Sequence, residues 1–141
     1  MRLASVFTAL LVLGACATPA PSSTPADWSA LADALGSEEY AETFLDELET
    51  RLDAADADLA PDQRTALYRV LYDGAERNRA LIARYRDAGP VQQPEAERAL
   101  LAERTRTDTE AEALLRPTQV PVYRALQRDV RAALAREAAR G

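Results

Sequence analysis

The chain has 141 residues, a formal net charge of −6, no histidine and one cysteine, and this length predicts a single domain. The negative charge argues against a nucleic acid as the main partner, because phosphate binding requires a basic surface. With no histidine and a single cysteine the chain cannot hold Ser–His or Cys–His nucleophiles, or imidazole sites for zinc, copper or nickel, so we predict no enzyme, no cofactor and no such metal site.

Residues 1–15 have the features of a secretory signal peptide. Met1 and Arg2 form a short basic start, and residues 3–13 are apolar, uncharged and too short to span a membrane. The run ends in Gly14 and Ala15, followed by Cys16, and this arrangement resembles the lipobox of bacterial lipoproteins. The resemblance implies cleavage after Ala15 and lipidation of Cys16. The alternative is an ordinary secretory signal with an incidental cysteine.

Residues 16–26 are predicted to form the lipidated cysteine and a tether. The tether carries three prolines and no large apolar side chain, a composition typical of extended, solvated chain. It is expected to hold a domain of residues 27–141 away from the bilayer. Ala17 follows Cys16 in place of an acidic residue, and in bacterial lipoproteins this pattern favours sorting to the outer membrane. We therefore expect an anchor in the outer membrane and a domain that faces the periplasm.

Residues 27–57 are expected to form two helices. A short leading helix over 27–35 would place Trp28, Leu31 and Leu35 on one side. Gly36 and Ser37 separate it from a helix over 38–57, and five residues of that helix are expected to face the core: Tyr40, Phe44, Leu48, Leu52 and Ala55.

A second face of residues 38–57 carries five carboxylates, which are Glu42, Asp46, Glu49, Asp53 and Asp56. Carboxylate oxygens are ligands for divalent cations. However, this row extends over about 20 Å of helix, whereas a metal site needs ligands that converge on one point. We interpret the row as a solvated acidic face.

The stretch 59–87 predicts the longest helix, beginning at Pro61, because proline is well accommodated in a first helical turn. Its inner face is expected to contain residues at steps of three and four: Leu67, Leu71, Gly74 or Ala75, Asn78, Leu81 or Ile82, and Tyr85. Gly89 and Pro90 end it.

Two further helices are expected over 95–114 and 117–139. The first has few apolar residues and is polar on nearly all sides from Thr105 to Glu112, which predicts an exposed helix or one that binds something outside the domain. The second should bury Val120, Tyr123, Leu126 or Gln127, Val130, and Ala133 or Leu134. No segment shows the alternation of a strand. The predicted fold is all-α, with four main helices and the short leading helix.

The charge is unevenly distributed, since residues 27–62 carry a net charge of −11 and residues 63–141 a net charge of +4. All the basic residues are arginines. We interpret the difference as attraction between helices that pack together, and a surface for binding a partner is the alternative.

A short motif occurs twice, 56 residues apart. Leu59, Pro61 and Gln63 return as Leu115, Pro117 and Gln119, each time before a helical pattern. The pair resembles the two Leu-Thr-x-x-Gln motifs of the Spy/CpxP family of periplasmic proteins, over residues 40–139.

In that family the motif begins a helix, threonine caps the helix, and glutamine reaches back to the cap. Here Ala60 and Arg116 replace the threonine, so each cap is expected to be weaker by about 1 kcal/mol. Without other evidence we interpret Gln63 and Gln119 as helix-start residues with no ligand role.

The resemblance implies an extended helical hairpin or cradle that works as a homodimer and holds unfolding proteins without ATP, using arginine and apolar side chains. It implies candidate client-binding residues, which are Arg77, Arg84, Arg124, Arg128 and Arg131. The alternative is that these arginines are partners of the acidic 38–58 helix.

The predicted function is therefore that of an envelope-anchored lipoprotein that acts as a periplasmic chaperone or stress-response binding module. It would bind unfolded or partner proteins, and the membrane through its lipid. One alternative is a structural or regulatory lipoprotein that docks on one dedicated partner through helix 95–114. A weaker one is a metal sensor built from carboxylates.

Overall fold

The structure, a computed structural model, describes residues 38–87 and 89–138. Four helices make up most of these residues. They are α2 (Glu38–Asp53), α3 (Pro61–Tyr85), α4 (Gln93–Glu112) and α5 (Val120–Ala138). No strand occurs in these residues, so the predicted all-α class is confirmed. The predicted signal peptide, Cys16, the tether and the short leading helix all lie outside the described residues.

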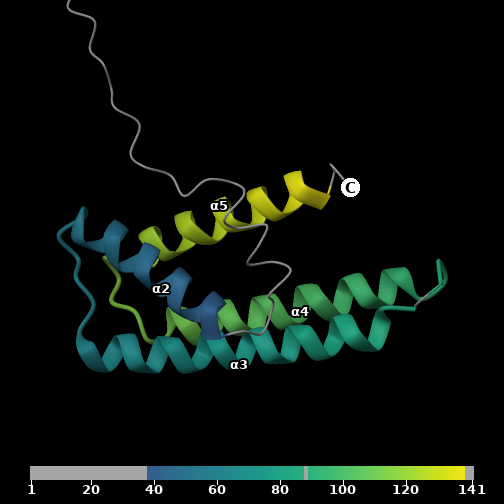
Figure 1. Ribbon diagram of the computed structural model, residues 1–141. Helices are drawn as coiled ribbons and strands as arrows, with labels where there is room; N and C mark the ends of the chain where they lie inside the picture. Colours follow the sequence, from purple (N-terminus) through teal and green to yellow (C-terminus); the bar gives the residue numbers. More distant parts are fainter. Residues whose placement is uncertain (1–37, 88, 139–141) are drawn as a thin grey trace, which may run out of the picture.

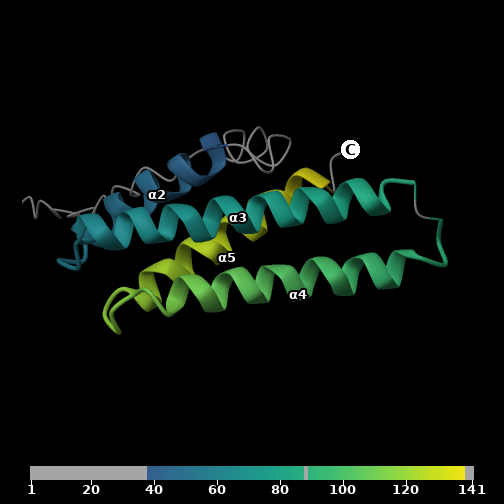
Figure 2. The ribbon, with the colours of Figure 1, turned by 90° about the horizontal axis from the view of Figure 1, so that it is seen from below.

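Helices α3 and α4 form a long antiparallel hairpin, and α2 and α5 lie on one side of it (Figures 1 and 2). The loops 54–60 and 113–119 lie together at one end. At the other end, the part of the hairpin that carries residues 86–92 projects beyond both α2 and α5 (Figure 1). None of the described helices combines the length and the apolar character needed to cross a membrane.

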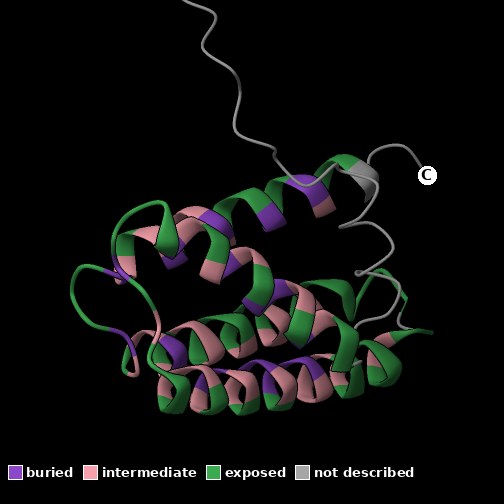
Figure 3. Cartoon of the chain, turned by 60° about the vertical axis from the view of Figure 1, so that its left-hand side comes forward, coloured by how far each residue is buried: buried purple, intermediate pink, exposed green. Residues whose placement is uncertain are grey.

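The core lies where α2 and α5 meet the covered half of the hairpin, and in Figure 3 the buried residues lie largely on these facing sides. The predicted inner faces of α2, α3 and α5 are confirmed for their central residues, which are Phe44, Leu48, Leu52, Leu67, Leu71, Tyr123, Leu126, Val130 and Ala133. The rings of Phe44 and Tyr123 meet edge to face with centroids 5.8 Å apart, an arrangement that aromatic quadrupoles favour.

Helix α2 ends at Asp53 and not at residue 57, so the prediction that Ala55 faces the core was wrong, and Ala55 is exposed. The amide of Asp56 donates to the carbonyl of Asp53 at 3.2 Å, and that of Ala57 to the carbonyl of Leu52 at 2.9 Å. Asp56 itself has a φ of 53°. These bonds form a Schellman motif with a left-handed residue, which satisfies carbonyls at the helix end.

Helix α4 packs along α3, contrary to the expectation that its polar middle is exposed or contacts something outside the domain. Gly74 makes this close approach possible, because a Cβ atom built on it would lie 2.4 Å from Oγ1 of Thr107. Only Ala111 of α4 is fully buried among the described residues. The two helices therefore approach through small and polar side chains, a kind of contact that an apolar periodicity does not reveal.

Helix α5 begins at Val120, three residues after the expected start at Pro117. Residues 117–119 form a turn that leads into it, since the amides of Gln119 and Val120 both donate to the carbonyl of Arg116, at 2.9 and 3.3 Å. Pro121 explains the difference. It has no N–H to donate to the carbonyl of Pro117, so the first turn lacks one helical bond.

Candidate functional site

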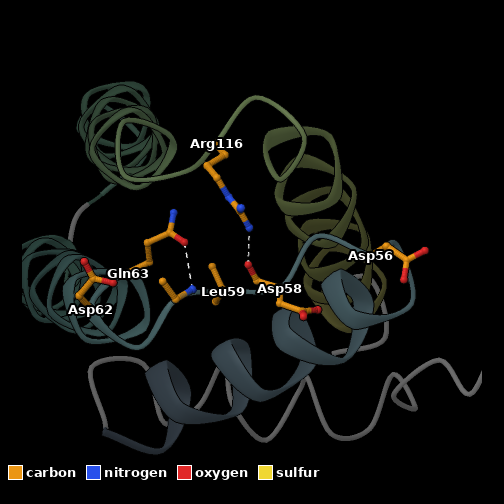
Figure 4. Close-up of a pocket in the computed structure, with 7 residues that line it drawn as sticks. Asp56, Asp58, Leu59, Asp62, Gln63 and Arg116 are labelled. Atoms are coloured by element: carbon orange, nitrogen blue, oxygen red, sulfur yellow. Dashed lines mark hydrogen bonds between the residues drawn. The ribbon is translucent and has the colours of Figure 1, made fainter.

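The repeated motifs lie in the two loops that meet at one end of the bundle. In the first motif, Oε1 of Gln63 accepts a hydrogen bond from the backbone N–H of Ala60 at 3.1 Å (Figure 4). Ala60 provides no side-chain cap, and Pro61 occupies the first turn. Gln63 thus supplies the half of a capping box that does not depend on the missing threonine.

The second motif repeats this contact. Oε1 of Gln119 accepts from the backbone N–H of Arg116 at 2.8 Å. Gln119 is the one polar residue in the described chain that is fully buried, with 0% of its surface exposed. Its Nε2 donates to the carbonyls of Ala57 at 3.0 Å and Asp58 at 2.9 Å, so its burial is compensated by hydrogen bonds.

The two glutamines also bond each other's loops. Nε2 of Gln63 donates to the carbonyl of Leu114 at 2.9 Å and to Oε1 of Gln119 at 3.1 Å. Leu114 stands 56 residues after Asp58, as Gln119 stands 56 residues after Gln63. The bonds are therefore related by an approximate two-fold symmetry, and the amides of both side chains are occupied in holding the two loops together.

The motif leucines and prolines differ in their burial. Leu115 is buried, Leu59 is half-buried against the core, and both prolines are exposed in the turns that begin the helices. Arg116, in the position of the second missing threonine, donates through its guanidinium to the carbonyl of Asp58 at 2.5 Å (Figure 4). This bond is a further link between the two loops.

An open cleft of about 600 Å³ lies beside these loops, and it is lined by Asp56, Asp58, Leu59, Ala60, Asp62, Gln63 and Arg116 (Figure 4). Its charge is mainly negative. Desolvation, a hydrogen bond that the protonated Asp53 donates to Asp58, and the charge of Asp58 raise the pKa of nearby Asp53. The described residues contain no group of three or more acidic, cysteine or histidine side chains arranged to hold a metal ion.

The row of carboxylates predicted on α2 is largely bound to one arginine. Arg64 of α3 donates to Glu42 at 2.9 Å, to Asp46 at 3.1 Å and to Glu49 at 3.1 Å. Hydrogen bonds to Glu42 and Glu49 raise the pKa of Arg64, so it stays charged at any pH the protein meets. This contact accords with the interpretation that the charge difference between the two parts of the chain reflects attraction between helices.

The five candidate arginines do not form one surface. Arg124, Arg128 and Arg131 line a cleft of about 280 Å³ between α4 and α5. Arg77 instead links α3 to α4, pairing with Glu103 at 2.5 Å and Glu110 at 3.4 Å. Arg84 lies over the ring of Tyr85, 5.3 Å from its centroid. The structure brings three of the five together and leaves two apart.

Three of these arginines pair with α4. Arg124 makes two bonds to Glu112, at 2.8 and 2.7 Å, and these bonds lower the pKa of Glu112. Arg131 pairs with Asp108. The interpretation of Arg77, Arg124 and Arg131 as partners of the acidic 38–58 helix was therefore wrong, because the carboxylates that they bind come from residues 103–112.

The projecting half of the hairpin, which is the end of α3 and the start of α4 on either side of residues 86–92, carries apolar side chains whose exposure the sequence did not predict. Ile82 is 37% exposed, Leu101 64% and Val91 93%. One signal was available: Leu100 and Leu101 are adjacent, and adjacent positions of a helix point about 100° apart, so both cannot face one partner helix. Exposed arginines of the same region include Arg79, Arg84 and Arg98.

Comparison with known proteins identifies no relative for this chain: no protein-family model matches it, and no curated protein and no solved structure is significantly similar to it.

Proposed function

We propose that this protein is an envelope lipoprotein whose helical domain binds other proteins, acting as an ATP-independent chaperone or a stress-response binding module. The observation that best supports this proposal is the projecting half of the α3–α4 hairpin. Ile82 and Leu101 are exposed on it, each within three residues of an arginine, and its end at residues 86–92 lies beyond the cover of α2 and α5.

Such a surface suits weak binding to non-native chains. Exposed apolar side chains contribute about 25 cal/mol per Å² of apolar surface removed from water, and arginine stems add apolar area next to a charge. Because the apolar residues are few and separated, each contact buries little apolar surface and contributes little binding free energy. A client can then dissociate and refold without energy from ATP.

The resemblance to the Spy/CpxP family supports the same proposal through the two motifs. The reciprocal bonds of Gln63 and Gln119 assign the motif a structural role, so the proposed binding surface lies elsewhere in the domain. The lipid anchor at Cys16, the outer-membrane location and the dimeric cradle are proposals that rest on the sequence and on this resemblance.

A second candidate is a lipoprotein that docks on one dedicated partner through α4. The face of α4 that points away from α3 favours it, because Arg98, Leu101, Thr105 and Thr109 are all exposed there. Under this proposal binding would be saturable and selective, whereas a chaperone would act on unrelated clients. The metal-sensor alternative has less support, since Arg64 already binds three of the five carboxylates.

Dilution of a chemically denatured, unrelated client tests the first proposal. The fragment 17–141, which contains every described residue, should lower light scattering at near-stoichiometric ratios without ATP. The Ile82→Ser, Leu101→Ser double variant should lose most of this effect, while the matched Leu101→Met variant, which keeps an apolar side chain, should retain it. Unchanged scattering with the folded wild-type chain would contradict the proposal.

A further inference from the structure

The cleft between α4 and α5 contains three arginines and two carboxylates. Its lining residues are Asp108, Glu112, Tyr123, Arg124, Gln127, Arg128 and Arg131, and its volume of about 280 Å³ is large enough for a side chain. Tyr123 is one of the lining residues, and its side chain is fully buried.

The two carboxylates of the cleft already have their partners. Glu112 receives two hydrogen bonds from Arg124. Asp108 receives one bond from Arg131 and another, at 3.2 Å, from the hydroxyl of Tyr123. Gln127 in turn donates to that hydroxyl at 2.9 Å. These contacts hold the cleft wall in place and leave neither acid without a cation.

Arg128 is the exception. It is exposed, and no carboxylate of the described residues lies within ion-pairing distance of it. The adjacent acid, Asp129, pairs with Arg51 of α2 at 2.7 Å. Three guanidinium groups against two carboxylates leave the cleft with one uncompensated positive charge, carried by Arg128.

We propose that Arg128 binds a carboxylate of a bound protein chain, so that this cleft selects clients with an aspartate or glutamate side chain in an extended segment. A guanidinium group is planar and binds a carboxylate through two parallel hydrogen bonds. Arg124 and Arg131 already pair with Glu112 and Asp108, so Arg128 is the guanidinium group of the cleft that is left for a carboxylate from outside. This inference rests on the proposed protein-binding function and adds the chemical class of the client.

The test uses two disordered synthetic peptides with the same apolar residues, one with four glutamates and one with glutamines in their place. Binding is followed by fluorescence anisotropy at low ionic strength with the chain 17–141. Arg128→Gln should weaken binding of the glutamate peptide about fivefold and leave the glutamine peptide unchanged. Arg128→Lys, which keeps the charge but not the planar guanidinium group, should weaken binding of the glutamate peptide by an intermediate factor.

Arg136→Gln is the matched control, because Arg136 is exposed on the same helix, lies outside the cleft and carries the same charge. Equal effects of Arg128→Gln and Arg136→Gln would overturn the inference, as would equal binding of the two peptides to the wild-type chain or no binding of either. If the wild-type chain still suppresses client aggregation in such a case, only this inference fails. If it does not, the proposed function fails as well.

Discussion

Gln63 and Gln119 each bond the loop in front of the other's helix: Nε2 of Gln63 reaches the carbonyl of Leu114, and Nε2 of Gln119 reaches the carbonyl of Asp58. Each also accepts the backbone N–H at the start of its own helix. The starts of α3 and α5 are therefore held to one another by two side chains 56 residues apart, which makes the two halves of the fold depend on one contact.

Replacing Gln119 by alanine should lower the free energy of unfolding by about 2–4 kcal/mol, because it leaves the buried carbonyl of Ala57 and the part-buried N–H of Arg116 without their bonds. Gln63→Ala should cost less, about 1–2 kcal/mol, since Gln63 is only half-buried. Urea unfolding followed by circular dichroism measures both. Gln92→Ala, at an exposed position, is the control, and a Gln119 variant as stable as this control would contradict the assigned role.

Gly74→Ala should destabilise the hairpin by about 1–3 kcal/mol, the usual cost of overpacking, although alanine is the better helix former. The added Cβ would lie 2.4 Å from Oγ1 and 2.6 Å from Cγ2 of Thr107. Thermal unfolding should show the loss, and a second change, Thr107→Ala, should recover it. Gly89→Ala, where nothing lies within 4 Å, should have little effect. A Gly74→Ala variant more stable than wild type would show that α3 and α4 are further apart.

Asp56→Gly should stabilise the protein by about 0.5–1 kcal/mol, because residue 56 has a φ of 53° that glycine adopts without steric cost. The change also removes a carboxylate from an acidic loop. Asp56→Ala separates the two effects, since alanine loses the charge but keeps a Cβ atom that disfavours a positive φ. If urea unfolding shows Ala and Gly to be equally stabilising, the gain comes from charge and not from the backbone.

Stability should fall as the pH rises above about 10. Burial and the charge of Asp108 raise the pKa of Tyr40 to about 12, and burial raises that of Tyr123 well above its usual range. In the unfolded chain tyrosines ionise near pH 10, so above that pH the unfolded state loses protons that the folded state keeps. Urea midpoints between pH 9 and 11 should decline, and less steeply in Tyr123→Phe. A flat profile for the wild-type chain would contradict the burial of these hydroxyls.

The helices that bury an apolar face were predictable from the sequence. Leu67 and Leu71 are four residues apart, and Tyr123 and Leu126 are three apart. Each pair therefore lies on one side of its helix, and all four residues are buried. The helix ends were less predictable. Asp56 adopts the left-handed conformation that glycine usually occupies, and an aspartate in the sequence does not predict it. The effect of Pro121 on the start of α5 was also not predicted.

The candidate site was less accessible to sequence reasoning because its contacts join distant residues. The recurrence of Gln63 and Gln119 was visible, but their spacing does not say that each amide reaches the other's loop. The pairing of Arg77 and Arg124 with acidic residues of α4 could not be predicted from the net charges of the two parts of the chain. Those net charges indicated residues 27–62 as the source of the acidic partners. The packing of α4 on α3 depends on Gly74 and Thr107, and neither residue contributes to an apolar pattern.

The most direct test of the central claim is an NMR titration of the ¹⁵N-labelled chain 17–141 with an unfolded, aggregation-resistant client. We predict chemical-shift changes concentrated in the α3–α4 hairpin around Ile82 and Leu101, and at the cleft around Arg128. Signals of the loop residues near Gln63 and Gln119 should stay unchanged, because their amides hold the fold. Shifts confined to those loops, or no shifts at all, would contradict the account.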